Sequence, residues 1–276
     1  MRSLSYSLDG KAGQWTGPAT LELRAGQVLA IDLKSGGHWY GHGFNHQQAW
    51  PLESGEISNP AFAVNNIQSP LWLASAGFAV LAETRAMLDV AVNAKGSGVL
   101  RIRATADNVT IRVFAGGTLV EAHEAAMRHL GGFDAAPGED LLGDSFFCTW
   151  TQYPRCITQE RILDMARQIR AQGYPCSRLI IDDRWESCFG ELTFAPRDFP
   201  DPRAMFAELH RLGFKVWLWV TPFVNQEAAT FAELSRAKAL VPRKDGAGAA
   251  TMRWWGGTAG LVDVTGPAGR EWYGAR

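Results

Sequence analysis

The alternation of hydrophobic and polar residues changes near the middle of the chain. Up to about residue 135, short apolar–polar runs are separated by Gly, Pro, Asn and Asp, as in Val99–Ala104 and Val109–Phe114. A period of two predicts strands with one buried face, and such regular hairpin spacing predicts an antiparallel β-sandwich. The strands are expected to form hairpins in three pairs: Thr20–Arg24 with Val28–Leu33, Phe78–Ala82 with Met87–Val92, and Val99–Ala104 with Val109–Phe114.

Two segments of this first half depart from the strand pattern. Gly36–Leu52 is rich in Gly, His and aromatic residues and is too irregular for a strand, so we expect a long loop. Either it is an ordered surface loop, or it is a lip that reaches over a pocket of the neighbouring domain. In Leu119–Leu130 the helical spacing of Val120, His123, Met127 and Leu130 predicts a helix that links two domains.

The second half alternates strands with helices. Strands are predicted at Phe146–Trp150, Arg178–Ile181 and Val216–Val220, with one helix capped by Thr158 and another opened by Asp201-Pro202. A third helix is expected at Asn225–Ala239, a strand or extended piece at Gly260–Val264 and a helix from Gly266-Pro267. Repeated strand–helix units predict a parallel sheet. A closed barrel needs about 250 residues, so these units form either a small open sheet or the front half of a barrel.

Composition excludes some classes of partner. The 276 residues carry a formal net charge of −1, which argues against general attraction to nucleic acid or to an anionic membrane. No apolar run is long enough to span a bilayer, and the opening MRSLSYSLDG lacks the apolar core of a signal peptide, so a cytoplasmic location is expected. The four cysteines show no CxxC spacing and are interpreted as free thiols of a reducing compartment.

Candidate chemistry lies where the second predicted strand ends. Asp182 and Asp183 follow three apolar strand residues, and barrel enzymes place their active sites at this end of the strands. A carboxylate there can accept hydrogen bonds from two sugar hydroxyls, although an Asp that caps the following loop is the alternative. Trp150, Trp185 and Trp219 also lie at or near strand ends and together are expected to wall a pocket, while each alone fits a core position as well.

Other catalytic arrangements find little support. Glycoside cleavage needs two carboxyl groups that flank the bond, and the consecutive Asp182 and Asp183 would diverge. Glu186 is explained as a solvated or capping group, and Trp254-Trp255 is a weaker candidate for the pocket rim. His42 and His46 lack a third ligand, so no metal site is predicted. Patterns typical of serine hydrolases, zinc proteases and nucleotide-binding enzymes are absent.

Several ordered motifs resemble glycoside hydrolase family 31, in particular the branch that contains the myogenesis-regulating glycosidase. The matching segments are WTQYPRCITQERIL, LIIDDRWE, GELTFAPRDFPDPRAMFAELHRLGFKVWLWVTPFVN and GLVDVTGPAGREW, and more loosely HWYGHGFNHQQAWPL. Members of that family are retaining α-glycosidases that need no metal or organic cofactor. The resemblance implies that Asp182, with Trp185, binds the sugar being cleaved, and that Trp219 and Trp150 lie beside it.

The resemblance also implies that the catalytic residues lie outside these 276 residues. The family's nucleophile and acid/base aspartates follow a segment like GLVDVTGPAGREW, so both are expected beyond Arg276, and no catalytic residue is assigned here. We therefore predict an amino-terminal fragment: a β-sandwich with linking helix at residues 1–135, and the first three to four units of a (β/α)8 barrel at 136–276. The expected ligand is a carbohydrate. The alternatives are an α-galactosidase of a related barrel family and a non-catalytic sugar-binding protein.

Overall fold

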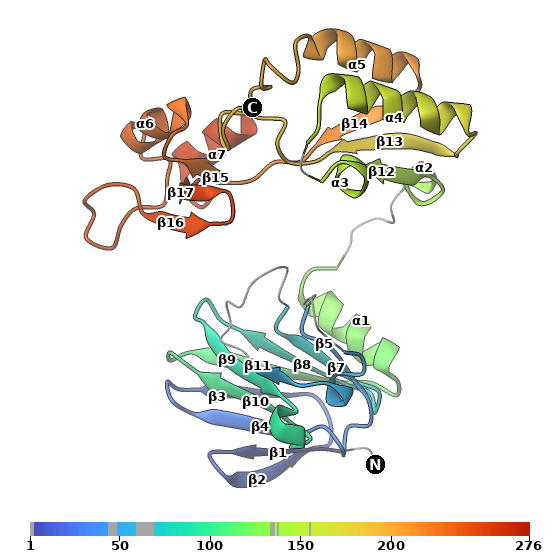
Figure 1. Cartoon of the computed structure of the whole chain (residues 1–276). Coiled ribbons are helices and arrows are strands. Elements are labelled where there is room, and N and C mark those ends of the chain that lie inside the picture. The colour runs from blue at the N-terminus through green and yellow to red at the C-terminus, as the bar shows by residue number, and fades with distance from the viewer. Residues whose placement is uncertain (1–2, 44–48, 59–68, 133–135, 137, 155) are drawn as a thin grey trace. The chain divides into compact units, whose positions relative to one another are not determined.

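The computed structural model describes the chain except for residues 1–2, 44–48, 59–68, 133–135, 137 and 155. The chain forms two compact units, Met1–Ala136 and Pro137–Arg276. Figure 1 draws the elements of both units, and each unit has a hydrophobic core of its own.

The first unit is an antiparallel β-sandwich, as predicted. Its described strands form one sheet in the order β2-β1-β4-β10-β9-β6 and a second in the order β3-β11-β8-β7-β5. The strands of the first sheet are β1 (Leu4–Leu8), β2 (Lys11–Trp15), β4 (Val28–Asp32), β6 (Ile57–Ser58), β9 (Leu88–Val92) and β10 (Val99–Ala104). Those of the second are β3 (Ala19–Leu23), β5 (Trp39–Gly41), β7 (Leu71–Ala74), β8 (Phe78–Glu83) and β11 (Val109–Ala115). Short 3-10 turns occur at Leu52–Ser54 and Ala94–Gly96.

The three hairpin pairs expected from the sequence are wrong. Strands β3 and β4, β8 and β9, and β10 and β11 each lie in opposite sheets. Strand β10 pairs with β4 and β9, whereas β11 pairs with β3 and β8. The turn residues Gly26 and Asn108 adopt positive φ, so the chain does reverse where the sequence indicated. The same turn residues serve a hairpin and an arch between sheets, which is why the turns alone misled the prediction.

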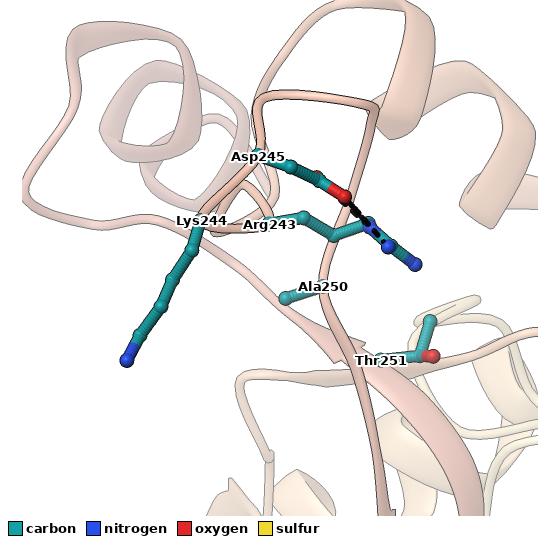
Figure 2. A pocket seen from close by; sticks show the side chains of 5 residues that line it. All are labelled: Arg243, Lys244, Asp245, Ala250 and Thr251. Carbon is teal, nitrogen blue, oxygen red and sulfur yellow. Dashed lines mark hydrogen bonds and ion pairs between the residues drawn. The ribbon is translucent and has the colours of Figure 1, made fainter.

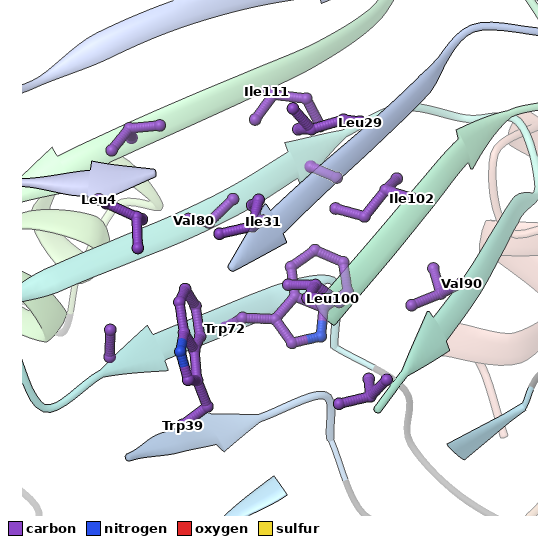
Figure 3. Packing of buried hydrophobic residues seen from close by; sticks show 14 of the residues in the cluster. Leu4, Leu29, Ile31, Trp39, Trp72, Val80, Val90, Leu100, Ile102 and Ile111 are labelled. Atoms are coloured by element: carbon purple, nitrogen blue, oxygen red, sulfur yellow. The ribbon is translucent and has the colours of Figure 1, made fainter. Parts of the chain in front are cut away.

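The core of the first unit lies between the two sheets. Leu100, Ile102 and Ala104 of β10 are buried while Arg101 and Arg103 are exposed, which confirms the predicted alternation. Figure 3 shows Ile31 and Leu100 from one sheet facing Val80 and Ile111 from the other, with the rings of Trp39 and Trp72 beside them. Burying each large aliphatic side chain of this kind stabilises the fold by about 1.5–3 kcal/mol.

Helix α1 (Leu119–His129) is present where predicted, but it buries a different face. The side chain of Thr118 caps it by accepting a hydrogen bond from the Glu121 N–H. Ala122 and Ala126 are fully buried against β8 and β11, whereas Val120 is 60% exposed. Small side chains let the helix approach the sheet closely, so packing outweighed the apolar stripe that the spacing suggested. The helix is therefore part of the sandwich unit rather than a free link (Figure 1).

The segment Gly36–Leu52 contains a strand that the sequence did not predict. Strand β5 pairs with β7 and buries the Trp39 ring, whose Nε1 donates to the Leu33 carbonyl at 3.1 Å. Gly41 has φ +104, and a Cβ there would meet the Leu71 carbonyl oxygen, so the pairing requires glycine. Residues 44–48 lie outside the described chain, and the lip over a pocket stays a prediction.

The second unit begins with a parallel sheet in the order β12-β13-β14, as predicted. Its strands are β12 (Ser145–Cys148), β13 (Cys176–Ile181) and β14 (Lys215–Leu218), and the connecting helices are α4 (Gln159–Ala171) and α5 (Pro202–Arg211). Both helices lie on one face of the sheet (Figure 1) and bury Ile162, Ile169, Met205 and Leu209 against Leu179 and Ile181. Two shorter helices, α2 (Glu139–Leu142) and α3 (Thr149–Gln152), flank β12.

Local signals predicted the helix ends correctly. The Thr158 hydroxyl accepts from the Arg161 N–H at 3.2 Å, and the Asp201 carboxylate accepts from the Ala204 N–H at 2.9 Å. Pro202 occupies the first turn of α5, and Gly213 follows that helix at φ +83. These caps satisfy backbone groups within a few residues of themselves, so the sequence around each helix end is sufficient to locate it.

The remainder of the second unit differs from the prediction. Strands β15 (Phe223–Asn225), β16 (Thr251–Trp254) and β17 (Gly257–Leu261) form a separate antiparallel sheet. The strand or extended piece expected at Gly260–Val264 overlaps the end of β17, which does not join the parallel sheet. Asn225 belongs to a strand, and the helix expected from it, α6 (Ala229–Arg236), begins only at Ala229. Helix α7 (Pro267–Gly274) starts at Pro267 as predicted.

Candidate sugar-binding edge of the parallel sheet

Three chain segments meet at the carboxyl edge of the β12–β13–β14 sheet. Beyond the last paired residues, the Asp182 N–H donates to Thr149 Oγ1 at 2.9 Å, and the Trp219 N–H donates to the Ile181 carbonyl at 2.8 Å. These bonds place Asp182 between the ends of β12 and β14. Parallel α/β sheets bind their ligands at this edge.

The Asp182 carboxylate is half-buried and held at both oxygens. Its Oδ2 accepts a hydrogen bond from the Cys148 thiol at 3.1 Å, and its Oδ1 accepts from the Asp183 N–H at 2.9 Å. Because each carboxylate oxygen carries two lone pairs, each retains one acceptor position. Since Cys148 is in register with Ile180, and alternate residues of a strand share a face, Asp182 extends the sheet face opposite to the one that packs on α4 and α5.

Asp183 is more deeply buried than its neighbour. Its side chain is 5% exposed, and its Oδ2 lies 3.7 Å from Nε of Arg184. Burial raises the pKa of Asp183 above its ordinary value, while the nearby Arg184 guanidinium opposes the rise and the Asp182 charge adds to it. The two consecutive carboxylates therefore occupy different environments, and Asp182 is the more exposed of the two.

Trp185 belongs to the hydrophobic core of the second unit. Its side chain is buried and packs on Phe194 with ring centroids 4.8 Å apart. The indole N–H donates to the backbone carbonyl of Trp219 at 2.8 Å. Trp185 thus connects the loop after β13 to the end of β14, and its hydrogen bond fixes the backbone of Trp219.

Trp219 is part of a group of four rings that we call the aromatic cluster, consisting of Phe189, Trp219, Trp254 and Trp255. The Phe189 ring lies 5.9 Å from Trp219, 5.1 Å from Trp254 and 5.4 Å from Trp255, and Trp219 lies 6.0 Å from Trp255. Trp255 is 64% exposed, and none of its three ring contacts is parallel. The cluster therefore presents an open indole beside Trp219, the residue that follows the end of β14.

Asn225 fixes the turn that carries Trp255. Its buried side chain accepts from Trp254 Nε1 at 3.0 Å through Oδ1 and donates to the Gly256 carbonyl at 2.9 Å through Nδ2. These two bonds hold the residues on either side of Trp255. The sequence analysis placed Asn225 at the start of a helix and overlooked Phe189. The position of Asn225 directly after the apolar Phe223-Val224 was the signal that could have placed it at the end of a strand.

Trp150 lies near the end of β12, on the side of the sheet edge away from β14. It sits in α3, two residues beyond the end of β12, and is 50% exposed. The strand predicted for Phe146–Trp150 ends at Cys148, because the chain turns there into the first turn of α3. The structure thus brings Asp182 and Trp219 to one edge, with the Trp255 ring packed on Trp219 and with Trp150 beside β12, while Asp183 and Trp185 are buried.

Glu186 is a buried loop cap rather than a solvated group. One oxygen of its carboxylate accepts from the N–H groups of Gly190 and Leu192 at 2.9 and 2.8 Å. Burial raises the pKa of Glu186, and the two backbone donors oppose the rise. The bonds shape the loop that carries Phe189, so Glu186 supports the aromatic cluster indirectly.

The depression in Figure 2 lies on the loop between α6 and β16. It is lined by Arg243, Lys244, Asp245, Ala250 and Thr251. Arg243 Nη2 and Asp245 Oδ2 form an ion pair at 2.7 Å, and Lys244 points away from that pair. None of its lining residues comes from the parallel strands, so it is not part of the candidate site.

The structure offers little for a metal ion. Among the residues that it describes, no three His, Cys, Asp or Glu side chains converge on one point. His42 Nδ1 accepts from Trp72 Nε1 at 3.2 Å, and burial lowers the pKa of His42. His46, its possible partner, lies outside the described residues.

Comparison with known proteins agrees with the resemblance. Residues 142–276 match the glycosyl hydrolases family 31 TIM-barrel domain. The chain belongs to glycoside hydrolase family 31. Within that family, residues 13–122 match the N-terminal domain of the myogenesis-regulating glycosidase.

Two curated relatives are similar along most of the chain. The myogenesis-regulating glycosidase of Mus musculus is 27% identical over 262 residues, which span 86% of this chain and 36% of that protein. An uncharacterized family 31 glucosidase of Pseudescherichia vulneris is 27% identical over 244 residues, which span 88% of this chain and 44% of that protein. The chain therefore spans less than half of the length of these relatives.

Solved structures share the fold. A family 31 dextranase of Flavobacterium johnsoniae, complexed with glucose, has a TM-score of 0.71 at 19% identity, covering 93% of this chain and 32% of that one. A family 31 α-xylosidase from a soil metagenome, complexed with xylose, has a TM-score of 0.67 at 21% identity, covering 90% and 36%. Within the described part of the chain, no helix is both long and apolar enough to cross a membrane.

Proposed function

We propose that the carboxyl edge of the β12–β13–β14 sheet binds the sugar ring of an α-glycoside, as part of a retaining α-glycosidase for glucosides, xylosides or galactosides. The observation that carries this proposal is the Asp182 carboxylate, which is fixed at both oxygens yet keeps one acceptor position on each. Two vicinal hydroxyls of a sugar are the donor pair that such a carboxylate fits.

The surrounding side chains have complementary roles in this proposal. Trp219 and the exposed Trp255 offer indole faces for the apolar C–H face of the sugar ring, and Trp150 flanks the ring from the side of β12. Asp183 and Trp185 were expected to touch the sugar, but both are buried. We assign them to the support of Asp182 and Trp219.

Hydrolysis with retention needs a nucleophile and an acid/base carboxyl about 5–5.5 Å apart on either side of the glycosidic bond. At this edge Asp183 is buried, and Glu186 is engaged by two backbone N–H groups, so neither suits that role. We propose that both catalytic carboxylates belong to a further part of the natural glycosidase. The share of its relatives that the chain spans, about a third, supports this proposal. The 276-residue chain is then expected to bind sugar without cleaving it.

The test is a binding titration of the chain with methyl α-glucoside, methyl α-xyloside and methyl α-galactoside, followed by calorimetry or NMR. Asp182→Asn is expected to weaken binding of the preferred glycoside about 10- to 100-fold. It removes the charge from the acceptor of two hydrogen bonds, and a hydrogen bond to a charged group contributes about 1.5–3 kcal/mol. Asp164→Asn is the matched control, since Asp164 is exposed on α4.

Binding that persists unchanged in Asp182→Asn would refute the assignment of the site. Release of methanol from any of the three glycosides by the unaltered chain would refute the separate proposal that its catalytic pair lies elsewhere. The pattern of preference among the three sugars identifies the substrate class.

A further inference from the structure

The Cys148 thiol occupies an unusual position for a cysteine with no metal or disulfide partner. It is one of four free thiols, and its Sγ lies 3.1 Å from Oδ2 of Asp182, although 34 residues separate the two in sequence. The contact connects the last residue of β12 with the residue that follows β13. Both side chains extend from the face of the sheet opposite to the one that packs on α4 and α5.

The thiol must be the donor in this contact. An ionised carboxylate has no hydrogen to donate and can only accept hydrogen bonds, as the other oxygen of Asp182 does from the Asp183 N–H. Burial raises the pKa of Cys148 to about 11, and the hydrogen bond to Asp182 adds to the rise. At neutral pH the group is therefore the protonated S–H, which has one hydrogen to give.

The two donors together determine how the carboxylate is turned. One donor alone leaves the carboxylate free to rotate about its terminal torsion, which is broad for aspartate. A second donor from the neighbouring strand selects one orientation. In that orientation the unused lone pair of each oxygen is available to a ligand, so less rotational freedom is lost when two hydroxyls bind.

The geometry points to Cys148 as a positioning residue that orients the Asp182 carboxylate for sugar binding through its S–H···Oδ2 hydrogen bond. The inference rests on the proposed function, since it specifies how the same carboxylate is prepared. Cys148 is not assigned a contact with the sugar. Sequence reasoning treated it only as one of four thiols without a metal spacing.

The first test follows the thiol and requires no sugar. The rate of alkylation of Cys148 by iodoacetamide is measured against pH, with mass spectrometry separating its peptide from those of the other three cysteines. In the unaltered chain the rate is expected to rise only toward pH 11. In Asp182→Asn the profile is expected to shift to lower pH, because the negative partner of the thiolate is gone. The control is Cys156, an exposed thiol whose profile should not move.

The second test follows binding of the preferred methyl α-glycoside. Cys148→Ala is expected to weaken binding about 3- to 10-fold, as loss of one modest hydrogen bond predicts. Cys148→Ser keeps a donor and is expected to stay within about 2-fold of the unaltered chain. Cys156→Ala is the matched control and should have no effect. Unfolding curves of all variants report whether any change arises from loss of the fold.

The two tests separate this inference from the proposed function. A Cys148 profile unmoved by Asp182→Asn overturns the inference, whatever the sugar titrations show. Full binding in a folded Cys148→Ala variant also overturns it while leaving the sugar site intact. If the unaltered chain binds none of the sugars, sugar binding by this chain is refuted, and with it the orienting role of Cys148. A shifted profile together with weakened binding that Cys148→Ser restores establishes the role.

Discussion

The indole N–H of Trp185 donates a 2.8 Å hydrogen bond to the backbone carbonyl of Trp219. This bond joins a core residue after β13 to a candidate sugar-contacting residue after β14. The backbone that carries the Trp219 ring is thus held by a buried side chain in the loop that follows the neighbouring strand β13. A ring that is already held in position before the ligand arrives loses less conformational entropy on binding.

Replacing Trp185 with phenylalanine tests that anchor. Trp185→Phe keeps an aromatic ring in the core but removes the donor and leaves a small cavity, so the free energy of unfolding is expected to fall by about 1–3 kcal/mol. Urea denaturation measures the change. Trp150→Phe is the control, because its half-exposed ring should alter the free energy of unfolding by no more than about 0.5 kcal/mol. Equal losses in the two variants would contradict the anchoring role.

Asn225 is expected to be required for the turn that presents Trp255. Asn225→Ala removes both bonds that hold Trp254 and the Gly256 carbonyl, which predicts a loss of about 2 kcal/mol in unfolding free energy. Trp255 should also become more accessible to a collisional quencher such as acrylamide. Gln226→Ala, at the exposed neighbouring position, should change neither quantity. A stable Asn225→Ala variant with unaltered quenching would show that the turn is held by other contacts.

The buried carboxyl of Glu186 predicts a pH dependence of stability. Because burial raises its pKa in the folded chain, Glu186 contributes its full stability below the ordinary value of 4.5, and that contribution is lost as pH rises through the higher folded value. In Glu186→Gln the oxygen that accepts from Gly190 and Leu192 is kept, but the titration is removed.

The variant is therefore expected to gain stability relative to the unaltered chain as pH rises from about 4 to 8. Denaturation curves at several pH values give the difference. Glu208→Gln should show the opposite trend, since its hydrogen bond with Arg211 lowers the pKa of Glu208. A difference between Glu186→Gln and the unaltered chain that does not vary with pH would contradict the assigned shift.

The contact of α1 with the sandwich gives a test of packing. Ala126 is fully buried against the sheet, so Ala126→Leu is expected to destabilise the chain by about 1–3 kcal/mol through overpacking. Val120→Leu adds bulk to the exposed side of the same helix and should stay within about 0.5 kcal/mol. Thermal unfolding compares the two. The reverse order would mean that the helix packs through the stripe first expected from the sequence.

The parts of the fold that the sequence predicted are those that depend on local chemistry. Thr158 and Asp201 cap helices by bonds to residues three positions away, and the alternation in Val99–Ala104 directly reports a strand with one buried face. The strand that ends at Asp182 was recognisable because an apolar run stops at two carboxylates. The family resemblance added what periodicity alone could not, namely the class of ligand to consider.

The parts that failed depend on distant residues. Whether the turn at Gly26 forms a hairpin or an arch depends on the partners of the strand that follows it. Strand β4 pairs with β1 and β10 of the other sheet, not with β3. Asn225 left the predicted helix because Trp254 and Gly256, about thirty positions later, supply its hydrogen bonds. Cys148 was passed over for the same reason, since its partner Asp182 lies on another strand.

The placement of strands β3 and β4 in opposite sheets has a consequence for synthesis of the protein on the ribosome. Strand β4 leaves the exit tunnel after one of its partners, β1, but long before the other, β10, and β3 leaves it long before its partner β11, the last strand of the sandwich. One backbone edge of each of these early strands thus remains unpaired until residues 99–115 have emerged. We expect nascent chains shorter than this to need chaperone protection, because loop closure over such separations is slow.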